Sequence, residues 1–463
     1  MKSPLNRLSL GFLVAFGLVA GALGYWTIVA RTSVLARQDN ARNVLAEQHI
    51  QRGRILARDE QVLAYTRFGE DGIAVRVYPH IEAASVVGYA SLRYGVSGIE
   101  AESDEILRGT AFLDLTETLI NQTLHRPLVG GDVRLTLDLA VQEAAYAALG
   151  DSSGAIVALE PYSGDILALV SLPSFDPNTL DENWDGLTAD PASPLLNRAT
   201  QGLYQPGTAF LPITLGEALN TGIDLKSSIA PGSSITRVDT VSFGCAKTPS
   251  RAVATLDDAF MWGCPGPFQR LGISLGRESI VSSIDDFGLT ETEFDLPVDQ
   301  VELEDNTRFD AGLTAIGQGR ITVTPWHMAL VASAFANRGQ MPAPHLISAT
   351  RAPDGEWIDN PISESLRGTI SPSSAVSIAT LMKLSVESGA AQAASQPGYD
   401  ISGVCGIALS GPEHAVDTWF IGFIVLPNDR LTAIAVLLDN QNDCDRASRI
   451  GGEVLRASAA TQP

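Results

Sequence analysis

Residues 197–214 read NRATQGLYQPGTAFLPIT, and this stretch decides the expected fold. Pro206 and Gly207 form a dipeptide that is typical of a turn. Thr208 follows where a helix is expected to begin, because a hydroxyl residue often marks a helix N-terminus. The apolar residues of 208–219 recur with the spacing of a buried helix. The stretch therefore predicts a turn that leads directly into a buried helix.

This layout resembles the acyl-serine site of penicillin-binding proteins, where a Pro-Gly turn leads into the motif S-x-x-K at a helix N-terminus. The two motif residues lie on one helical face, so the lysine amine can take the proton of the serine hydroxyl. Here positions 208–211 hold Thr, Ala, Phe and Leu. Thr208 stands at the serine position and Leu211 at the lysine position. The resemblance therefore implies a hydroxyl without its base.

The rest of the chain does not supply the motif either. The lysines of this sequence are Lys2, Lys226, Lys247 and Lys383. Lys2 is too close to the first residue to have a partner three positions earlier, and the other three have Ile, Gly and Thr there. No S-x-x-K occurs anywhere in the sequence.

The segments before residue 132 resemble the membrane-proximal part of class B penicillin-binding proteins. The resemblance rests on residues 52–64, which read as two short strands around a turn, and on echoes at residues 76–79, 94–100 and 107–109. In that family such a segment forms a pedestal between the membrane and the catalytic domain. The resemblance implies the same arrangement here.

The remainder resembles the transpeptidase domain of the same family. Apolar runs at residues 155–159 and 165–171 predict paired antiparallel strands, which lead into the string Leu-Pro-Ser-Phe-Asp-Pro-Asn at residues 172–178. Residues 315–339 carry two further matches with a helix expected between them, and two apolar runs within residues 418–438 predict the last antiparallel strands.

We therefore expect an α+β fold, with a transpeptidase domain like that of penicillin-binding proteins and serine β-lactamases, in which helices pack on an antiparallel sheet. The expected parts are a cytoplasmic tip and transmembrane signal anchor at residues 1–31, a pedestal similar to the family's dimerisation domain at residues 32–131, and a transpeptidase-like domain at residues 132–463.

The second family motif, S-x-N, should fall at a break between two helices. The chain has Gly263, Cys264 and Pro265 at this break. The serine hydroxyl and asparagine amide that would relay a proton and orient the substrate are thus replaced by a hydrogen and a proline ring.

The third family motif, K-T-G, supplies a cation for the substrate carboxylate from a strand that lines the site. Val404 stands for the lysine, Cys405 stands for the hydroxyl residue, and Gly406 alone agrees. Together with Leu211, Val404 would make the former cleft apolar, which favours a closed cleft or a docking surface over a site for a peptide carboxylate.

Composition excludes several other functions. A net charge of −22 and a pI near 4.6 argue against nucleic-acid binding and against a basic membrane-surface patch. The sequence contains no C-x-x-C pair, and its six histidines show no metal-ligand spacing. We expect neither a metal nor another cofactor.

The apolar run from Leu8 to Ala30 contains no charged residue and is long enough to cross a bilayer about 30 Å thick. It predicts an uncleaved signal anchor, and a cleaved signal peptide is the competing interpretation. Charge around the run does not decide its orientation. The family resemblance implies a single-pass membrane protein with the bulk of the chain outside the cytoplasm.

Four cysteines could form two disulfides in such an environment, with three possible connectivities. The first hypothesis is Cys245–Cys264 and Cys405–Cys444, and four buried thiols are the alternative. Cys405 as a nucleophilic thiol is disfavoured, because its motif contains no histidine and His414 lies beyond a Gly-Pro turn.

Thr208 has two interpretations: a helix N-cap worth about 1 kcal/mol, which we favour, or a nucleophile. Losing the base of an activated nucleophile commonly costs on the order of 10⁴-fold in rate. The favoured function is therefore a non-catalytic homologue with no catalytic residue, which acts as a scaffold or regulator of cell-wall synthesis or division proteins at the membrane, with peptidoglycan as a further candidate ligand. The alternative is an active peptidoglycan D,D-transpeptidase, or penicillin-binding enzyme, that uses Thr208.

Overall fold

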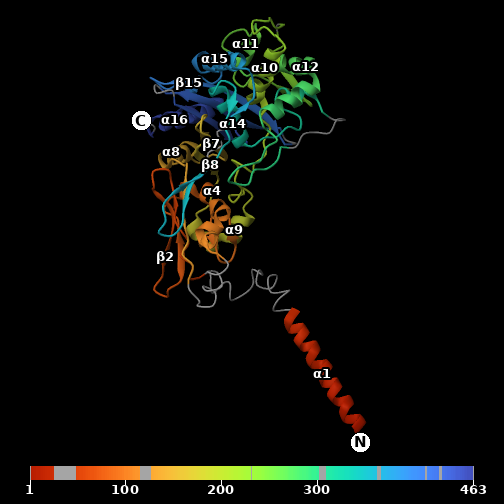
Figure 1. Ribbon diagram of the computed structural model, residues 1–463. Coiled ribbons are helices and arrows are strands. Elements are labelled where there is room, and N and C mark those ends of the chain that lie inside the picture. Colours follow the sequence, from red (N-terminus) through yellow and green to blue (C-terminus); the bar gives the residue numbers. More distant parts are fainter. Residues whose placement is uncertain are drawn as a thin grey trace.

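Two β-sheets organise the folded part of the chain in the computed structural model (Figure 1), which describes residues 2–25, 48–114, 127–230, 232–301, 309–361, 366–411, 414–426 and 430–461. The first sheet, in the lower part of the view, contains the pedestal strands. The second lies above it and is covered by helices on both faces. The structure thus confirms the expected α+β fold with a helix-covered antiparallel sheet.

The pedestal sheet has six strands in the order β13-β12-β6-β1-β2-β3. These strands are β1 (Ile55–Leu56), β2 (Val62–Phe68), β3 (Ala74–Val77), β6 (Asp132–Leu135), β12 (Ile347–Arg351) and β13 (Ile358–Asp359). Strands β1 and β6 run parallel, and the other neighbours run antiparallel. Because β12 and β13 come from late in the chain, the sheet joins segments from both sides of the predicted boundary at residue 132.

Short elements complete the pedestal: η2 (Ile81–Ala83), α4 (Ala84–Val87), β4 (Ala90–Ser91), β5 (Gly95–Val96), α5 (Ile99–Glu102), α6 (Asp104–Arg108) and η3 (Thr110–Phe112). A buried ion-pair cluster holds them against the sheet. The fully buried Glu100 lies 2.6 Å from Arg76 Nε and 2.8 Å from Arg52 Nη2. Burial alone would raise the pKa of Glu100, but the two guanidinium groups outweigh it and hold this pKa below its usual range. Three of the pedestal motifs thus meet at one carboxylate.

The second sheet has five antiparallel strands in the order β15-β16-β17-β7-β8, so β15 and β8 are its edges. The strands are β7 (Gly154–Leu159), β8 (Ile166–Leu172), β15 (Asp400–Ser410), β16 (Ala415–Val425) and β17 (Leu431–Leu438). These bounds agree with the four strands that the apolar runs predict. Nearly every residue of β7, β8 and β17 is buried, as expected for strands covered on both faces.

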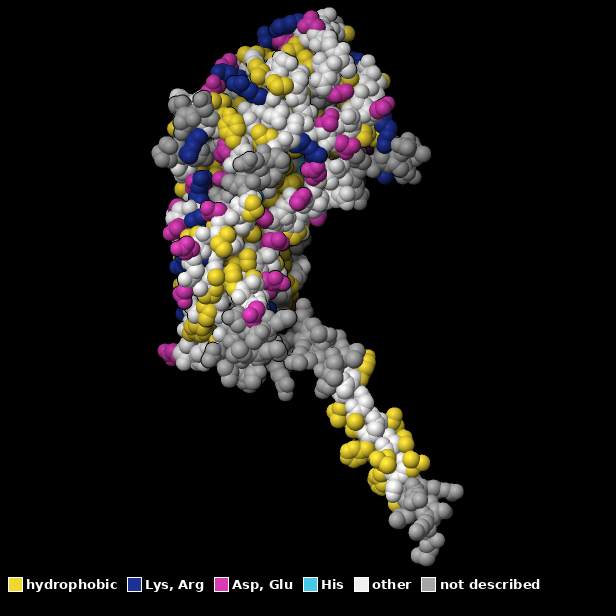
Figure 2. All heavy atoms as spheres, viewed as in Figure 1, with side chains coloured by type: hydrophobic (Ala, Val, Ile, Leu, Met, Phe, Trp, Pro, Cys, Tyr) yellow, Lys and Arg dark blue, Asp and Glu magenta, His cyan; other side chains and the backbone are white. Residues whose placement is uncertain are grey.

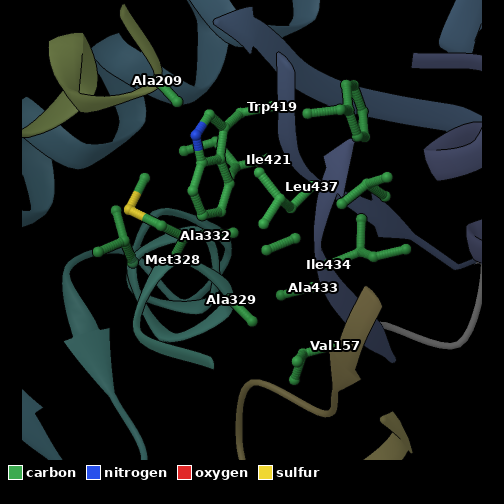
Figure 3. Close-up of a cluster of buried hydrophobic side chains, with 14 of the residues drawn as sticks. Val157, Ala209, Met328, Ala329, Ala332, Trp419, Ile421, Ala433, Ile434 and Leu437 are labelled. Carbon is green, nitrogen blue, oxygen red and sulfur yellow. The ribbon is translucent and has the colours of Figure 1, made fainter. Parts of the chain in front are cut away.

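Helices α8 (Leu139–Leu149) and α16 (Cys444–Thr461) pack on one face of this sheet, and α14 (Pro325–Ala336) packs on the other. In Figure 3, Met328 and Ala332 of α14 face Trp419 of β16. Helix α14 starts with a capping box between Thr324 and His327, which satisfies backbone amides at its first turn. The helix expected within residues 315–339 is therefore present at the centre of the core.

The remaining described elements lie in the upper part of the view and around the sheets. They are η4 (Pro177–Thr179), α9 (Leu180–Ala189), η5 (Gly207–Phe210), α10 (Leu211–Asn220), β9 (Thr236–Val238), β10 (Val241–Phe243), α11 (Leu256–Met261), α12 (Pro265–Asp286), α13 (Ala311–Thr314), β11 (Gln340–Met341), β14 (Arg367–Gly368), α15 (Pro372–Ser388) and η6 (Gln392–Ala394). Strands β9 and β10 form a hairpin, and β11 pairs with β14.

Asn178, the last residue of the string at 172–178, joins the pedestal to the transpeptidase-like domain. Its side-chain oxygen accepts a hydrogen bond from Tyr78 N at 2.9 Å, and its amide nitrogen donates to Tyr78 O at 2.9 Å. Nearby, Ser85 Oγ donates to Leu169 O of β8 at 2.8 Å. These bonds use main-chain groups of both parts and fix them to one another.

Helix α1 (Lys2–Gly24) lies apart from the folded body, and its apolar side chains are exposed (Figure 2). Among the residues that the structure describes, no helix combines the length and the apolar character needed to cross a membrane. The predicted span from Leu8 to Ala30 extends beyond the described part, because residues 26–30 lie outside it.

Candidate functional site

The positions of the three family motifs converge where η5 meets the edge strand β15. Ile407 N donates a hydrogen bond to Thr208 Oγ1 at 3.0 Å. A Cβ atom added to Gly263 would lie 3.4 Å from the same oxygen and 3.1 Å from Cys405 O. The fold therefore brings together the altered serine, S-x-N and K-T-G positions around one hydroxyl group.

Thr208 lies inside η5 and is almost completely buried, with 1% of its surface exposed. The favoured interpretation as a helix N-cap is wrong: the residues before η5 and α10 are Pro206 and Phe210, and neither caps its helix through a side chain. The Thr208 hydroxyl instead accepts a hydrogen bond from the amide of Ile407, which points away from the sheet at its edge strand. The Thr208 side chain thus makes a tertiary hydrogen bond in place of the helix cap that the local sequence predicts.

Leu211 is the first residue of α10 and belongs to the hydrophobic core, with 1% of its surface exposed. The three lysine side chains that the structure describes are held in ion pairs. Lys226 pairs with Asp257, Lys247 pairs with Asp445, and Lys383 pairs with Asp400. The hydrogen bonds to the aspartates raise the pKa of Lys226 and of Lys383, whereas a general base requires a lowered pKa. Lys226 and Lys383 are therefore not arranged as bases for Thr208.

The S-x-N positions are occupied by residues that suit the backbone and carry no catalytic group. Gly263 has a φ of +61°, a conformation that favours glycine. A Cβ at this position would also lie 2.7 Å from Ala246 Cβ. Pro265 is at the start of α12, where proline is well suited because its missing N–H would have no helical partner.

Strand β15 approaches η5 backbone to backbone. Val404, Cys405 and Gly406 are buried. A Cβ on Gly406 would lie 2.1 Å from Ala209 N, and a Cβ on Gly207 would lie 1.9 Å from Ile407 O. Glycine at position 406 is therefore required by this close approach, independently of any chemistry.

The opening stretch at residues 197–214 is held from behind by residues 315–326. Tyr204 and Val323 exchange two backbone hydrogen bonds of 2.9 and 2.8 Å, and Gly207 N donates to Gly317 O at 2.8 Å. Gly317 has a φ of +63°, and a Cβ there would lie 2.2 Å from Gly207 O. Each stretch therefore supplies a backbone surface on which the other packs.

Comparison with known families agrees with this arrangement. Residues 154–459 match the model of the penicillin-binding-protein transpeptidase domain, and residues 52–133 match that of the penicillin-binding protein A dimerisation domain. The chain belongs to the penicillin-binding-protein transpeptidase family.

Individual relatives cover almost the whole chain. The peptidoglycan D,D-transpeptidase PbpA of Mycolicibacterium smegmatis is 32% identical over 481 residues, which cover 98% of this chain and 96% of the relative. PbpA of Mycobacterium tuberculosis gives the same identity and coverage. The structure of penicillin-binding protein A from M. tuberculosis as a penicillin G acyl-enzyme complex has a TM-score of 0.78 at 31% identity, and covers 88% of this chain and 99% of that one.

Both disulfides that we predicted for this penicillin-binding-protein homologue are confirmed as Cys245–Cys264 and Cys405–Cys444. Cys264 is the middle residue of the former S-x-N motif, and Cys405 is the middle residue of the former K-T-G motif. Because Cys405 is bonded to Cys444, it is not a free thiol. The altered S-x-N and K-T-G motifs are thus each cross-linked to another part of the domain.

His327 and His345 both contact side chains or backbone groups of the fold. Burial lowers the pKa of His327 to about 4, and its ring lies 2.8 Å from Thr324 Oγ1 and 2.9 Å from Glu291 O. His345 Nε2 lies 3.1 Å from Asp165 Oδ1. Within the described ranges, no group of three or more His, Cys, Asp or Glu side chains is placed to hold a metal ion.

Sequence reasoning did not identify Ile407, Ala246 or the Lys247–Asp445 pair as parts of this site. Ile407 directly follows the K-T-G positions, so the motif alignment could have pointed to its amide. Ala246 and Lys247 lie in a loop with no motif, and their place at the site follows from the tertiary fold.

Proposed function

We propose that this chain is a non-catalytic member of its family, which acts by binding as a scaffold or regulator of peptidoglycan synthesis in cell-wall assembly or division. The observation that carries the proposal is the environment of Thr208. Its buried hydroxyl accepts the Ile407 amide, and the base position is the buried Leu211. Without a base, a hydroxyl nucleophile loses on the order of 10⁴-fold in rate.

The proposed location is the membrane, with the bulk of the chain outside the cytoplasm. The uncharged run from Leu8 to Ala30 and the exposed Phe12 and Phe16 of α1 support an anchor. The two disulfides support an oxidising compartment. The proposed partners are membrane proteins of cell-wall synthesis or division, with peptidoglycan as a further ligand.

The alternative is an active D,D-transpeptidase that uses Thr208. The position of Thr208 favours it, because a hydroxyl remains at the nucleophile position of a family whose M. tuberculosis member forms acyl-enzymes with β-lactams. This alternative requires a base that the described lysines do not provide without breaking their ion pairs.

Covalent capture of a fluorescent penicillin by the full-length protein separates the two functions. We expect no labelled band after denaturation, in a preparation whose circular dichroism shows a folded protein and beside penicillin-binding protein A of M. tuberculosis as positive control. A band that disappears in Thr208→Ala would overturn the non-catalytic proposal. A band that persists in Thr208→Ala would instead report labelling elsewhere on the chain.

A further inference from the structure

Ala246, in the loop of residues 244–249, lies against the altered S-x-N position. Ala246 N donates a hydrogen bond to Gly263 O at 3.1 Å, and Ala246 is buried. The Ala246 Cβ and Thr208 Oγ1 lie 2.7 and 3.4 Å from the point that a Cβ at Gly263 would occupy. Ala246 therefore fills the space through which a side chain at position 263 would reach the Thr208 hydroxyl.

The segment is anchored on both sides of Ala246. On one side, Cys245 is bonded to Cys264 in the loop before α12. On the other, Lys247 Nζ lies 2.5 Å from Asp445 Oδ1, in the first turn of α16. The side chains of this ion pair are partly exposed, and such pairs hold a loop weakly. The disulfide is therefore the dominant anchor.

We propose that residues 244–249 are a redox-held plug of the former catalytic cleft, which a dithiol reductant releases. A thiolate of the reductant attacks Cys245 Sγ, the S–S bond breaks, and Cys264 leaves as a thiolate. The second thiol of the reductant then displaces Cys245, so that two electrons and two protons pass from the dithiol to the two cysteines. Released from Cys264, the plug keeps the Lys247 ion pair, the backbone hydrogen bond from Ala246 N to Gly263 O and the packing of Ala246 against the core.

The two disulfides differ in their access to a reductant, which gives the proposal an internal control. Cys245 is partly exposed, whereas Cys264 is fully buried. Cys405 and Cys444 are 1% and 8% exposed. Thiol–disulfide exchange requires access to a sulfur atom, so the plug disulfide is the one open to attack in the folded protein.

The test uses the native full-length protein and dithiothreitol as the dithiol. New thiols are trapped with iodoacetamide and located by peptide mass spectrometry, and amide hydrogen exchange is measured before and after reduction. We expect Cys245 and Cys264 to be alkylated at least about 10-fold faster than Cys405 and Cys444. Exchange of the Ala246 and Ile407 amides, which donate hydrogen bonds at this site, should then rise by about 10-fold or more, while the β16 and β17 amides keep their protection.

Unchanged exchange at residues 244–249 after complete reduction of Cys245–Cys264 would overturn the proposal. Equal reduction of both disulfides, or loss of protection across β16 and β17, would overturn it as well, because the disulfide would then hold the fold rather than the plug.

Variants provide the matched comparison. The double variant Cys245→Ser with Cys264→Ser should show the raised exchange without reductant, and Cys405→Ser with Cys444→Ser should leave residues 244–249 protected. If the first does not fold, reduction of the native protein decides alone. In Lys247→Gln, which keeps the disulfide, the segment should stay protected until dithiothreitol is added, and early release would overturn the dominant role of the disulfide.

The inference goes beyond the proposed function, since it concerns access to the cleft and not its chemistry. Repeating the penicillin capture after reduction distinguishes a failure of the plug proposal from a failure of the proposed function. Labelling of Thr208 only after reduction would overturn the non-catalytic function and support the plug. Unchanged exchange without labelling would overturn the plug and leave the proposed function standing.

Discussion

The substitution Leu211→Lys restores the lysine of the first motif and tests whether the cleft is filled. Leu211 has 1% of its surface exposed and lies in the hydrophobic core. A lysine at this position loses hydration and is expected to be neutral in the folded protein. Keeping a lysine neutral at pH 7 costs about 5 kcal/mol, because its usual pKa is near 10.4 and each unit is worth 1.36 kcal/mol.

The sign of the pH dependence follows from proton uptake. In Leu211→Lys the unfolded chain binds a proton that the folded chain does not, so stability rises with pH until the amine is neutral in both states. At pH 9.5 the same cost falls to about 1 kcal/mol. Urea unfolding of the full-length protein at the two pH values measures both quantities.

Leu211→Met is the matched control, because it keeps an apolar side chain of similar volume and should cost less than about 1.5 kcal/mol at either pH. If Leu211→Lys and Leu211→Met unfold at the same urea concentration at pH 7, the lysine reaches water, and the reasoning that the cleft is filled is refuted.

Three further substitutions test other parts of the structure. Glu100→Gln leaves Arg76 with an uncompensated buried charge and should lower the free energy of unfolding by about 3 to 5 kcal/mol. Glu100 stabilises the fold above the usual glutamate pKa, and this stability is lost as pH falls through its lowered pKa, so the variant should lack this pH dependence. Pedestal amides that exchange at the wild-type rate in the variant would contradict the predicted loss of stability. Gly406→Ala places a methyl group against η5 and should lower stability by about 1 to 3 kcal/mol in urea unfolding, whereas a neutral result would mean that the strand can move away from η5. His345→Gln should lower the free energy of unfolding by about 1 kcal/mol near pH 6. The hydrogen bond to Asp165 raises the pKa of His345, so the stability that the protonated imidazole contributes is complete below about pH 6.5. The difference in stability between variant and wild type should vanish as pH rises through the raised pKa, and a constant difference up to pH 9 would assign the effect to packing.

Much of the fold could be predicted because its strands and central helix have strong apolar patterns of their own. The strands β7, β8, β16 and β17 coincide with apolar runs bounded by turn residues. The pairing of β6 with β12 has no such signal, since it joins distant segments and each strand is short.

The sequence predicted which family motif residues are absent from the site, but it did not predict the contacts that the substituted residues make. The motif alignment identified Thr208 and Leu211 as altered positions. It could not show that the Thr208 hydroxyl accepts the Ile407 amide, because an edge-strand N–H is satisfied by whatever the tertiary fold brings to it. The helix-cap interpretation failed for the same reason: local preference is weak beside a buried long-range hydrogen bond.

The six-stranded pedestal sheet has a mechanical consequence. Because β12 and β13 return from the transpeptidase-like domain to pair beside β6, the connection between the two parts consists of hydrogen-bonded strands and not of a single linker. A torque applied to the pedestal is therefore transmitted to the domain above through these paired strands and through the Asn178 bonds to Tyr78. A protein that bound the pedestal would therefore set the orientation of the upper domain, whatever residues occupy the motif positions.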